Sequence, residues 1–416
     1  MRRHEQNRGI PGMVGVVDVG TSKVCCIIAA PGEGGQTLLG LGHQRSQGIK
    51  SGMVVDADEA ERSVRAAVGQ AERMAGVSLD RVVVAVACGR IKSAGFVARA
   101  RVEGAVVKAG DIDRVIAGGE AYVERSGRSL IQLTRSDWQL DDVKGVRDPR
   151  GLAGRELSVQ LTAITADDAP LRNLLGVIER CYLAVDGLAA TPFASAIAVA
   201  TPEERRVGAL VLDIGAGVTS LAAFSDSRIV YADAIPVGGL HVTYDVARAL
   251  STPVAEAERI KTLYGTLVKA ASDSADVISY SVVGEEEQVL FQTSKAHLRE
   301  VIEPRVTHVF ALVEERLKSA SLTGFASGRV ILTGGGSQIL GLDQAWMRRF
   351  GGVVRIGRPK PIGRMPGNMC SPAFATAIGL AMAEVSQSAG FETGRRPLPG
   401  SAGYIGRMRQ WISESF

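Results

Sequence analysis

The hydrophobic positions of this chain form two similar runs, beginning at Val14 and at Ala209, which lie 195 positions apart. Each run is apolar, ends in Asp-x-Gly, passes through small residues and enters a second apolar run. This pattern predicts a buried strand, a tight turn and a second strand at both places. The chain therefore contains two halves that begin in the same way.

The rest of the first half predicts a mixed α/β body. Alanine and valine recur at helical spacing between residues 57 and 75, and residues 81–87 form a dense β-branched run, so a helix and a strand are expected. Residues 89–165 break this rhythm, with strands expected at 96–102, 130–133 and 157–165 around a helix at 111–123. We interpret them as an inserted α+β unit. A helix at 170–181, a strand at 184–188 and a helix at 192–200 return to the body.

The second half continues with a longer alternation of helices and strands. Helices are expected at 240–250, 254–264 and 293–320, near 342, and at 372–383, and strands at 277–283, 287–291 and 330–333. Residues 386–400 are rich in Ser, Gly and Pro and have the composition of a linker. The segment 401–416 that follows is amphipathic.

Composition narrows the class of protein. A chain of 416 residues with 46% hydrophobic and 22% charged residues is expected to fold into at least two domains. The net charge of +4 is too small to favour nucleic acid as a partner. Three of the five cysteines (Cys25, Cys26 and Cys88) lie in apolar runs, which indicates buried thiols in a reducing compartment, the cytosol. No apolar segment is long enough to span a bilayer, and no export signal is recognised.

The two Asp-x-Gly turns are candidates for gripping a phosphate chain from both sides. Their small residues allow backbone N–H groups to approach an anion, hydroxyls add donors, and Lys23 adds a positive charge. Asp18 and Asp213 end their strands, where carboxylates hold Mg²⁺ through its waters. The predicted phosphate-binding residues are Gly20, Thr21, Ser22, Lys23, Gly215, Ala216, Gly217 and Thr219. For either turn alone, a glycine-stabilised hairpin is the alternative.

A third glycine-rich element follows the strand at 330–333. Gly334, Gly335 and Gly336 leave room for a ligand to lie flat against the backbone, so adenosine is expected there. The three elements together predict a site for ATP with Mg²⁺.

These motifs resemble those of the superfamily of actin, sugar kinases and heat-shock chaperone ATPases. The more specific resemblance is to the FtsA family of bacterial cell-division actin homologues, and it extends from residue 13 to 416. It is carried by Gly20–Val24, Gly145–Gly154, Ala257–Lys261, Val301–Arg305 and Val330–Gly336. It implies a two-lobed actin-like fold of two RNase H-like halves, with an inserted SHS2-like domain and a C-terminal amphipathic helix.

The resemblance also implies domain boundaries and further site residues. Glu258 and Lys261 would contact the ribose and adenine, although three-residue spacing on a helix also suits a solvated ion pair. The expected boundaries are the first lobe at 12–88, 166–203 and 365–385, the insert at 89–165, the second-lobe core at 204–240 and 305–364, its subdomain at 241–304, the linker at 386–400 and the membrane helix at 401–416.

Two positions argue against rapid hydrolysis. Brisk ATPases of this superfamily place an acid or amide before the helix-opening proline or at the end of the second turn. Thr191 and Ser220 occupy these positions here, and Ala216 replaces the middle glycine of the turn. Neither hydroxyl is an effective base at neutral pH, so we name no catalytic residue and expect ATP turnover to be slow or absent.

The last residues have the pattern of a helix lying in a membrane interface. On a helical wheel an apolar arc is flanked by two arginines. The predicted membrane-binding residues are Tyr404, Ile405, Arg407, Met408, Arg409, Trp411, Ile412 and Phe416. Docking of this helix on the protein body is the alternative. With so little charge, one helix binds anionic lipid only marginally, and polymerisation would make attachment firm.

The resemblance implies that the protein polymerises, anchors the FtsZ ring to the cytoplasmic face of the inner membrane at mid-cell, and recruits later division proteins. The FtsZ C-terminal peptide would dock on residues 241–304. Arg248, Arg259 and Lys261 are candidates for binding an acidic peptide there, with ordinary surface charge as the alternative. The competing functions are a phosphotransferase of the sugar-kinase type and a pilus-assembly actin-like ATPase.

Overall fold

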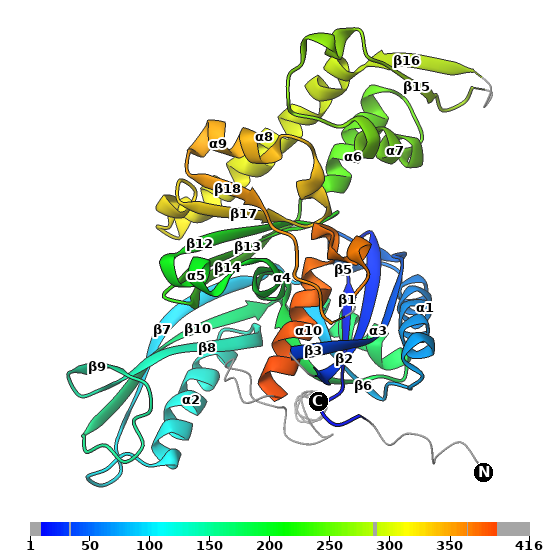
Figure 1. The fold of residues 1–416 in the computed structure, drawn as a ribbon. Helices are drawn as coiled ribbons and strands as arrows, with labels where there is room; N and C mark the ends of the chain where they lie inside the picture. Colours follow the sequence, from blue (N-terminus) through cyan, green and yellow to red (C-terminus); the bar gives the residue numbers. More distant parts are fainter. Residues whose placement is uncertain (1–9, 33–34, 286–288, 364, 389–416) are drawn as a thin grey trace, which may run out of the picture.

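The computed structural model describes residues 10–32, 35–285, 289–363 and 365–388, and it has two lobes with a smaller unit attached at one side (Figure 1). The helices of the described ranges include none that is long and apolar enough to cross a bilayer.

The first lobe is a five-stranded sheet in the order β11-β6-β1-β2-β3, covered by helices on both faces. Strand β2 runs antiparallel to both of its neighbours, β1 and β3, whereas β6 and β11 run parallel to β1. The strands are β1 (Val14–Val19), β2 (Lys23–Gly32), β3 (Gly35–Arg45), β6 (Arg81–Val86) and β11 (Ala184–Ala190). Helices α1 (Ala57–Ala75) and α3 (Asp168–Arg180) share one buried core with the sheet, and α4 (Thr191–Val199) and α10 (Ala375–Ser388) share another. A short hairpin of β4 (Ile49–Lys50) and β5 (Met53–Val54) lies between β3 and α1.

The second lobe repeats this sheet. Its strands, in the order β18-β17-β12-β13-β14, are β12 (Ala209–Ile214), β13 (Thr219–Ser225), β14 (Arg228–Ile235), β17 (Arg329–Thr333) and β18 (Val353–Ile356). Asp18 lies opposite Cys25 in the first lobe, and Asp213 lies opposite Ser220 in the second, so even the register is repeated. The two halves are structural copies, as the paired runs predict. The helix α5 (Pro202–Val207) connects them.

A subdomain of the second lobe lies at the top of Figure 1. It combines α6 (Gly239–Ala249), α7 (Val254–Tyr264), the hairpin of β15 (Val277–Ser281) and β16 (Leu290–Ser294), and the first part of α8 (Lys295–Ser319). Helix α8 then descends along the lobe towards α9 (Leu342–Phe350), and Trp346 of α9 packs edge-on against Phe310 of α8. The long helix therefore joins the subdomain to the lobe core.

The insert lies between β6 and α3 and has its own core around Trp138. It contains β7 (Lys92–Arg101), α2 (Ala109–Glu124), β8 (Ser129–Leu140), β9 (Val143–Val146) and β10 (Glu156–Ala166). Strand β7 also pairs with the edge strand β14, Lys92 opposite Asp233, so the insert and the second lobe share one nine-stranded sheet. The sequence pattern did not predict this connection.

Most of the expected elements are present. Helices at 57–75 and 254–264 have the predicted bounds, and Cys25, Cys26 and Cys88 are buried as expected. Strands β14 and β18 were not predicted. Helix α10 begins at Ala375, after a 3-10 turn, and runs to Ser388, into the first residues of the predicted linker. The predicted membrane helix at 401–416 lies outside the described residues.

Candidate nucleotide site

The two Asp-x-Gly turns have the same geometry. The N–H of Gly20 donates to the carbonyl of Lys23 at 3.0 Å, and the N–H of Gly215 donates to the carbonyl of Val218 at 2.9 Å. A Cβ at either glycine would lie 2.9 Å from the same carbonyl oxygen, closer than side chains tolerate. Glycine is therefore required at both positions by the close approach of the returning strand.

The turns meet across the two lobes. A Cβ on Gly217 would lie 2.5 Å from Oγ1 of Thr21 and 2.9 Å from Cα of Ser51. The Thr21 hydroxyl oxygen also accepts a hydrogen bond from the Gly52 N–H at 3.0 Å. The structure thus brings the first turn, the β4–β5 hairpin and the second turn into direct contact, although they are far apart in sequence.

The two carboxylates that end β1 and β12 are electrostatically linked. Burial raises the pKa of the Asp18 carboxyl to about 6, with Lys23 lowering it and the charge of Asp213 raising it further. Burial also raises the pKa of Asp213, whose Oδ2 accepts a hydrogen bond from the Thr376 hydroxyl at 3.0 Å. Two carboxylates and one ammonium leave an excess of negative charge, so a cation would be favourable here. In the described part of the chain, no three His, Cys, Asp or Glu side chains gather as a metal cluster.

The triple glycine lies against the second turn. Gly334 has a φ of +83°, and a Cβ there would collide with Oδ1 of Asp213. The N–H of Gly239 donates to the Gly215 carbonyl at 2.8 Å, and a Cβ on Gly239 would lie 3.5 Å from Cα of Gly336. The start of α6, the second turn and the triple glycine therefore form one backbone-lined wall, with Gly335 and Gly336 in the 3-10 turn after β17.

Glu258 and Lys261 lie beside this wall. The Lys261 ammonium is 2.7 Å from the Glu258 carboxylate, and it donates to the Gly239 carbonyl at 3.2 Å and to the Thr243 hydroxyl at 2.8 Å. The pair predicted from three-residue spacing is thus formed, and it belongs to a network at the start of α6. Contact of this pair with a ribose or adenine stays a prediction.

The hydroxyls that replace acids are buried. Ser220 lies within β13, and Thr191 opens α4, with its Oγ1 making no hydrogen bond in the described structure. The neighbouring Thr219 donates its hydroxyl to the Val237 carbonyl at 2.7 Å. Slow or absent hydrolysis of ATP stays a prediction.

Sequence reasoning missed one segment that contacts all three motifs, residues 371–376. The Lys23 ammonium donates to the Ala373 carbonyl and lies 4.3 Å from the ring centroid of Phe374. The Pro372 carbonyl accepts from the Gly334 N–H at 3.2 Å, and Thr376 donates to Asp213. The local signal is only a Ser-Pro step before a helix. Its contacts depend on residues up to 350 positions away, which no local pattern encodes.

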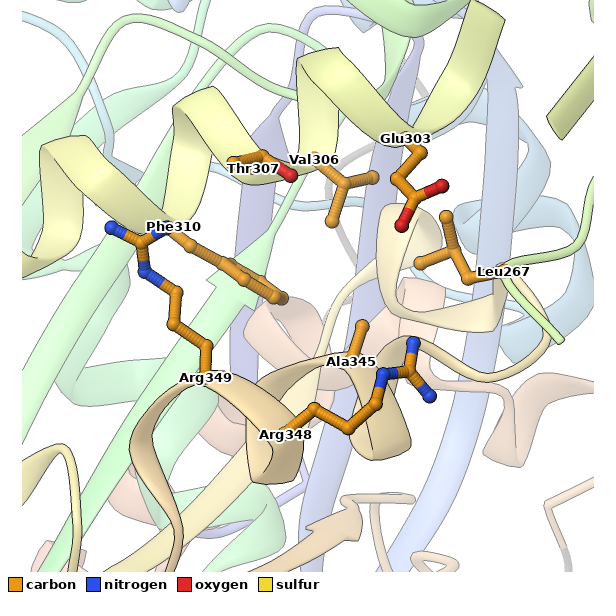
Figure 2. A pocket seen from close by; sticks show the side chains of 8 residues that line it. All are labelled: Leu267, Glu303, Val306, Thr307, Phe310, Ala345, Arg348 and Arg349. Atoms are coloured by element: carbon orange, nitrogen blue, oxygen red, sulfur yellow. The ribbon is translucent and has the colours of Figure 1, made fainter. Parts of the chain in front are cut away.

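A separate cavity of about 240 Å³ lies between α8 and α9, in the second lobe (Figure 2). Its lining combines apolar, charged and hydroxyl side chains. Its lining residues are Leu267, Glu303, Val306, Thr307, Phe310, Ala345, Arg348 and Arg349. None of the predicted nucleotide-binding residues is among them.

Two of the solved structures with a similar fold are the following. The PilM–PilN type IV pilus biogenesis complex matches 89% of this chain and 98% of its own, with a TM-score of 0.62 and 18% identity. The structure of MreB5 of Spiroplasma citri bound to ADP matches 92% of this chain and 100% of its own, with a TM-score of 0.55 and 16% identity. These similarities establish the actin-like fold.

Sequence comparisons are more specific. The family model for the cell division protein FtsA matches residues 210–379, and that for the SHS2 domain inserted in FtsA matches residues 88–165. The FtsA of Rhizobium meliloti is 35% identical, over 97% of this chain and 95% of its own length. The FtsA of Neisseria meningitidis is 31% identical, over 97% of this chain and 98% of its own length. The FtsA of Escherichia coli K12 is 28% identical, over 96% of this chain and 97% of its own length. With its repeated lobes and its SHS2 insert, this chain belongs to the FtsA family of actin-like cell division proteins.

Proposed function

We propose that the region where the two Asp-x-Gly turns and the triple glycine meet, between the lobes, binds ATP together with Mg²⁺. The observation that carries this is the contact of the two repeated turns across the lobes, with Asp18 and Asp213 held beside Lys23. Gly217 packs against Thr21 and Ser51, and Gly334 packs against Asp213, too closely for a side chain at either position. Glycine there therefore keeps the two turns and the triple glycine together. The ADP held by the similar MreB5 structure supports this choice of ligand.

Each element of this region has a role in the proposal. Backbone N–H groups of both turns, with the hydroxyls of Thr21 and Ser22, bind phosphate oxygens, and Lys23 leaves the Ala373 carbonyl to neutralise phosphate charge. Asp18 and Asp213 hold the waters of the cation, which itself lowers the charge density on the phosphates. Gly334–Gly336 and the Glu258–Lys261 pair face the nucleoside.

Isothermal titration of the full chain with ATP, with and without Mg²⁺, tests the proposal. We expect binding that weakens without the metal, and that weakens further when Asp213→Asn removes one of the two carboxylates. Lys261→Ala is expected to weaken ATP binding without changing the dependence on Mg²⁺, because it lies at the nucleoside side. Undetectable binding of ATP by the well-folded parent chain would refute the proposal.

The bound nucleotide acts as a structural switch, and its hydrolysis is slow or absent. Thr191 and Ser220, at the two positions that could orient an attacking water, carry only hydroxyl groups and lie buried. Loss of a water-positioning group costs orders of magnitude in phosphoryl transfer. Steady-state phosphate release above about 1 s⁻¹, the low end of common enzyme rates, would contradict this part of the proposal.

On the membrane, the protein forms filaments that anchor the FtsZ ring to the cytoplasmic face of the inner membrane at mid-cell. Membership of the FtsA family supports this role, and the apolar arc of residues 404–416 supports attachment to anionic lipid. Later division proteins would join the same assembly. A phosphotransferase of the sugar-kinase type would not need a membrane-binding segment such as 404–416. A pilus-assembly ATPase would not bind the FtsZ peptide.

Electron microscopy on lipid monolayers with ATP separates these readings. Filaments are expected from the full chain, and a chain ending at residue 400 is expected to leave the monolayer bare. In liposome co-sedimentation, equal binding by monomer and polymer would contradict coupling between assembly and attachment. Binding of an FtsZ C-terminal peptide, measured by fluorescence anisotropy, is expected to weaken with Arg248→Glu in the 241–304 subdomain. Absence of any peptide binding would favour the pilus-type alternative.

A further inference from the structure

The insert belongs to the first lobe by chain connection, yet its sheet is paired with the second lobe. The chain leaves the first lobe after β6 and returns at the start of α3. We propose that the insert is mechanically coupled to the second lobe, so that its far end follows the angle between the two lobes. Figure 1 shows the insert reaching from this junction to the lower left, below the sheet of the second lobe.

The junction with the first lobe, called the neck below, is held by hydrogen bonds and by apolar packing, because Ile131 of β8 and Ile164 of β10 belong to the same buried core as α3. The Asp167 N–H donates to the Gly89 carbonyl at 2.6 Å, so the two chain crossings lie side by side. Arg128 of the insert donates to the Arg90 carbonyl at 2.7 Å and also pairs with the Asp167 carboxylate. Gly89 has a φ of +75°, and a Cβ there would lie 2.9 Å from the Asp167 carbonyl oxygen. The insert is therefore attached to the first lobe as well as to the second, so a movement between the lobes must be taken up at one of these two junctions.

The junction with the second lobe lies along β14. The Ala232 N–H donates to the Ser93 hydroxyl at 2.7 Å, next to the pairing of Asp233 with Lys92. The Arg228 guanidinium lies 2.6 Å from the Asp137 carboxylate of β8. Strand β14 would otherwise be the edge of its sheet, and these contacts occupy backbone groups that an edge strand leaves unpaired. The insert is therefore fastened to the second lobe at more than one point.

Strand β14 is itself fixed within the second lobe. The carboxylate of Asp233 is 5% exposed, accepts a hydrogen bond from the Tyr231 hydroxyl at 2.7 Å and lies 3.8 Å from the Arg316 guanidinium of α8. Helix α8 has 25 residues and is therefore about 38 Å long. It connects the subdomain that carries β15 and β16 to this anchor. A displacement of the second lobe thus moves β14, and with it the strand β7.

The shape of the insert amplifies small rotations. Strand β8 has 12 residues, which corresponds to about 40 Å from the neck to the far end. A rotation of about 5° about the neck would move that end by roughly 3 Å for a strand of this length. The coupling therefore converts a small change in the angle between the lobes into a larger displacement of the β8–β9 end.

Spin-label distances in the full chain test the coupling. One label is placed at Lys144→Cys on β9 and the other at Gln344→Cys on α9, with Cys181→Ser and Cys370→Ser removing the half-exposed thiols. The parent is expected to give one narrow distance distribution. Loosening the junction with Ser93→Ala and Arg228→Ala is expected to widen it at least about twofold, because the insert is then held mainly at its neck.

The matched control is Arg99→Ala, which breaks an exposed 3.9 Å ion pair with Glu156 inside the insert and leaves the junction intact. We expect this control to keep the parent distribution. An unchanged width in the loosened variant would overturn the proposal, as would equal widening in the control.

Hydrogen exchange gives a second, independent measurement. Ser93→Ala removes the acceptor of the Ala232 N–H, so exchange at this amide is expected to accelerate about tenfold or more, while β12 in the lobe centre stays protected. Unchanged exchange at Ala232 would show that the junction does not hold in solution and would overturn the proposal. Both measurements are made without nucleotide, so they remain interpretable if the proposed ATP binding fails.

Discussion

Gly217 offers the sharpest test of the contact between the two turns. Its φ lies outside the left-handed region, so alanine imposes no backbone strain, and the effect of Gly217→Ala is purely one of space. The new Cβ would lie 2.5 Å from Oγ1 of Thr21, whereas unstrained contacts lie beyond about 3.4 Å. Thr21 or the whole turn must therefore retreat by about 1 Å.

The cost can be worked from what this retreat breaks. Moving Thr21 by about 1 Å removes its hydrogen bond with the Gly52 N–H, worth about 1 kcal/mol. Overpacking against Cα of Ser51, which is backbone and cannot rotate away, adds about 1 to 2 kcal/mol. If ATP requires both turns in contact, a loss of about 2 to 3 kcal/mol raises the Kd by roughly 30- to 150-fold.

The assay is isothermal titration with Mg²⁺ and ATP, with the thermal unfolding midpoint of each variant measured in parallel. Gly176→Ala in α3 is the control, because a Cβ there meets nothing within 4 Å. It should bind ATP like the parent. The double variant Thr21→Ala/Gly217→Ala should recover part of the lost thermal stability, since it removes the nearest colliding atoms. An ATP affinity for Gly217→Ala within a factor of three of the parent would refute the reasoning.

Three further outcomes are expected. Gly118→Ala should stabilise the protein by about 0.5 to 1 kcal/mol, because the new Cβ meets nothing in the exposed middle of α2. Gly119→Ala should destabilise it by about 1 to 3 kcal/mol, because the new Cβ collides with Leu161 of β10. Urea unfolding measures both changes. Because the pKa of Asp18 is raised to about 6, the folded state binds this proton more tightly than the unfolded chain does. The free energy of unfolding of the parent should therefore fall by roughly 2 to 3 kcal/mol as the pH rises from about 4 to about 6. The Asp18→Asn variant should lack this contribution, and unfolding midpoints measured against pH test the difference. Arg299→Met should cost about 3 kcal/mol in urea, because it leaves the buried Asp273 carboxylate without its cation, and a loss below about 1 kcal/mol would contradict this.

The elements with strong local signals could be predicted well. Helix α1 has apolar residues at helical spacing and an Asp56 cap whose side chain accepts from the Glu59 N–H, and its bounds agree with the prediction. Strands β14 and β18 carry mixed polar and apolar residues and were missed. Their pairing partners, rather than their own sequence, make them strands.

The candidate site divides in the same way. Asp18 and Asp213 could be identified because each ends an apolar strand before a glycine turn, which is a local pattern. The Ser371–Thr376 segment could not, since its importance lies in contacts with Lys23, Gly334 and Asp213. The role of Lys261 falls between these cases. Its pairing with Glu258 follows from helical spacing, and its contact with the Gly239 carbonyl does not.

The sequence by itself determined that the chain has two halves of the same construction, an insert within the first half, and three glycine-rich elements suited to a nucleotide. It did so because strand alternation, helical spacing and the conformational demands of glycine act over a few neighbouring residues. Only the tertiary structure decided that Gly217 closes onto Thr21, that residues 371–376 join the three motifs, and that β7 of the insert extends the sheet of the second lobe. These contacts join residues far apart in the chain, and they form because close packing of the lobes leaves room for only one arrangement of their edges.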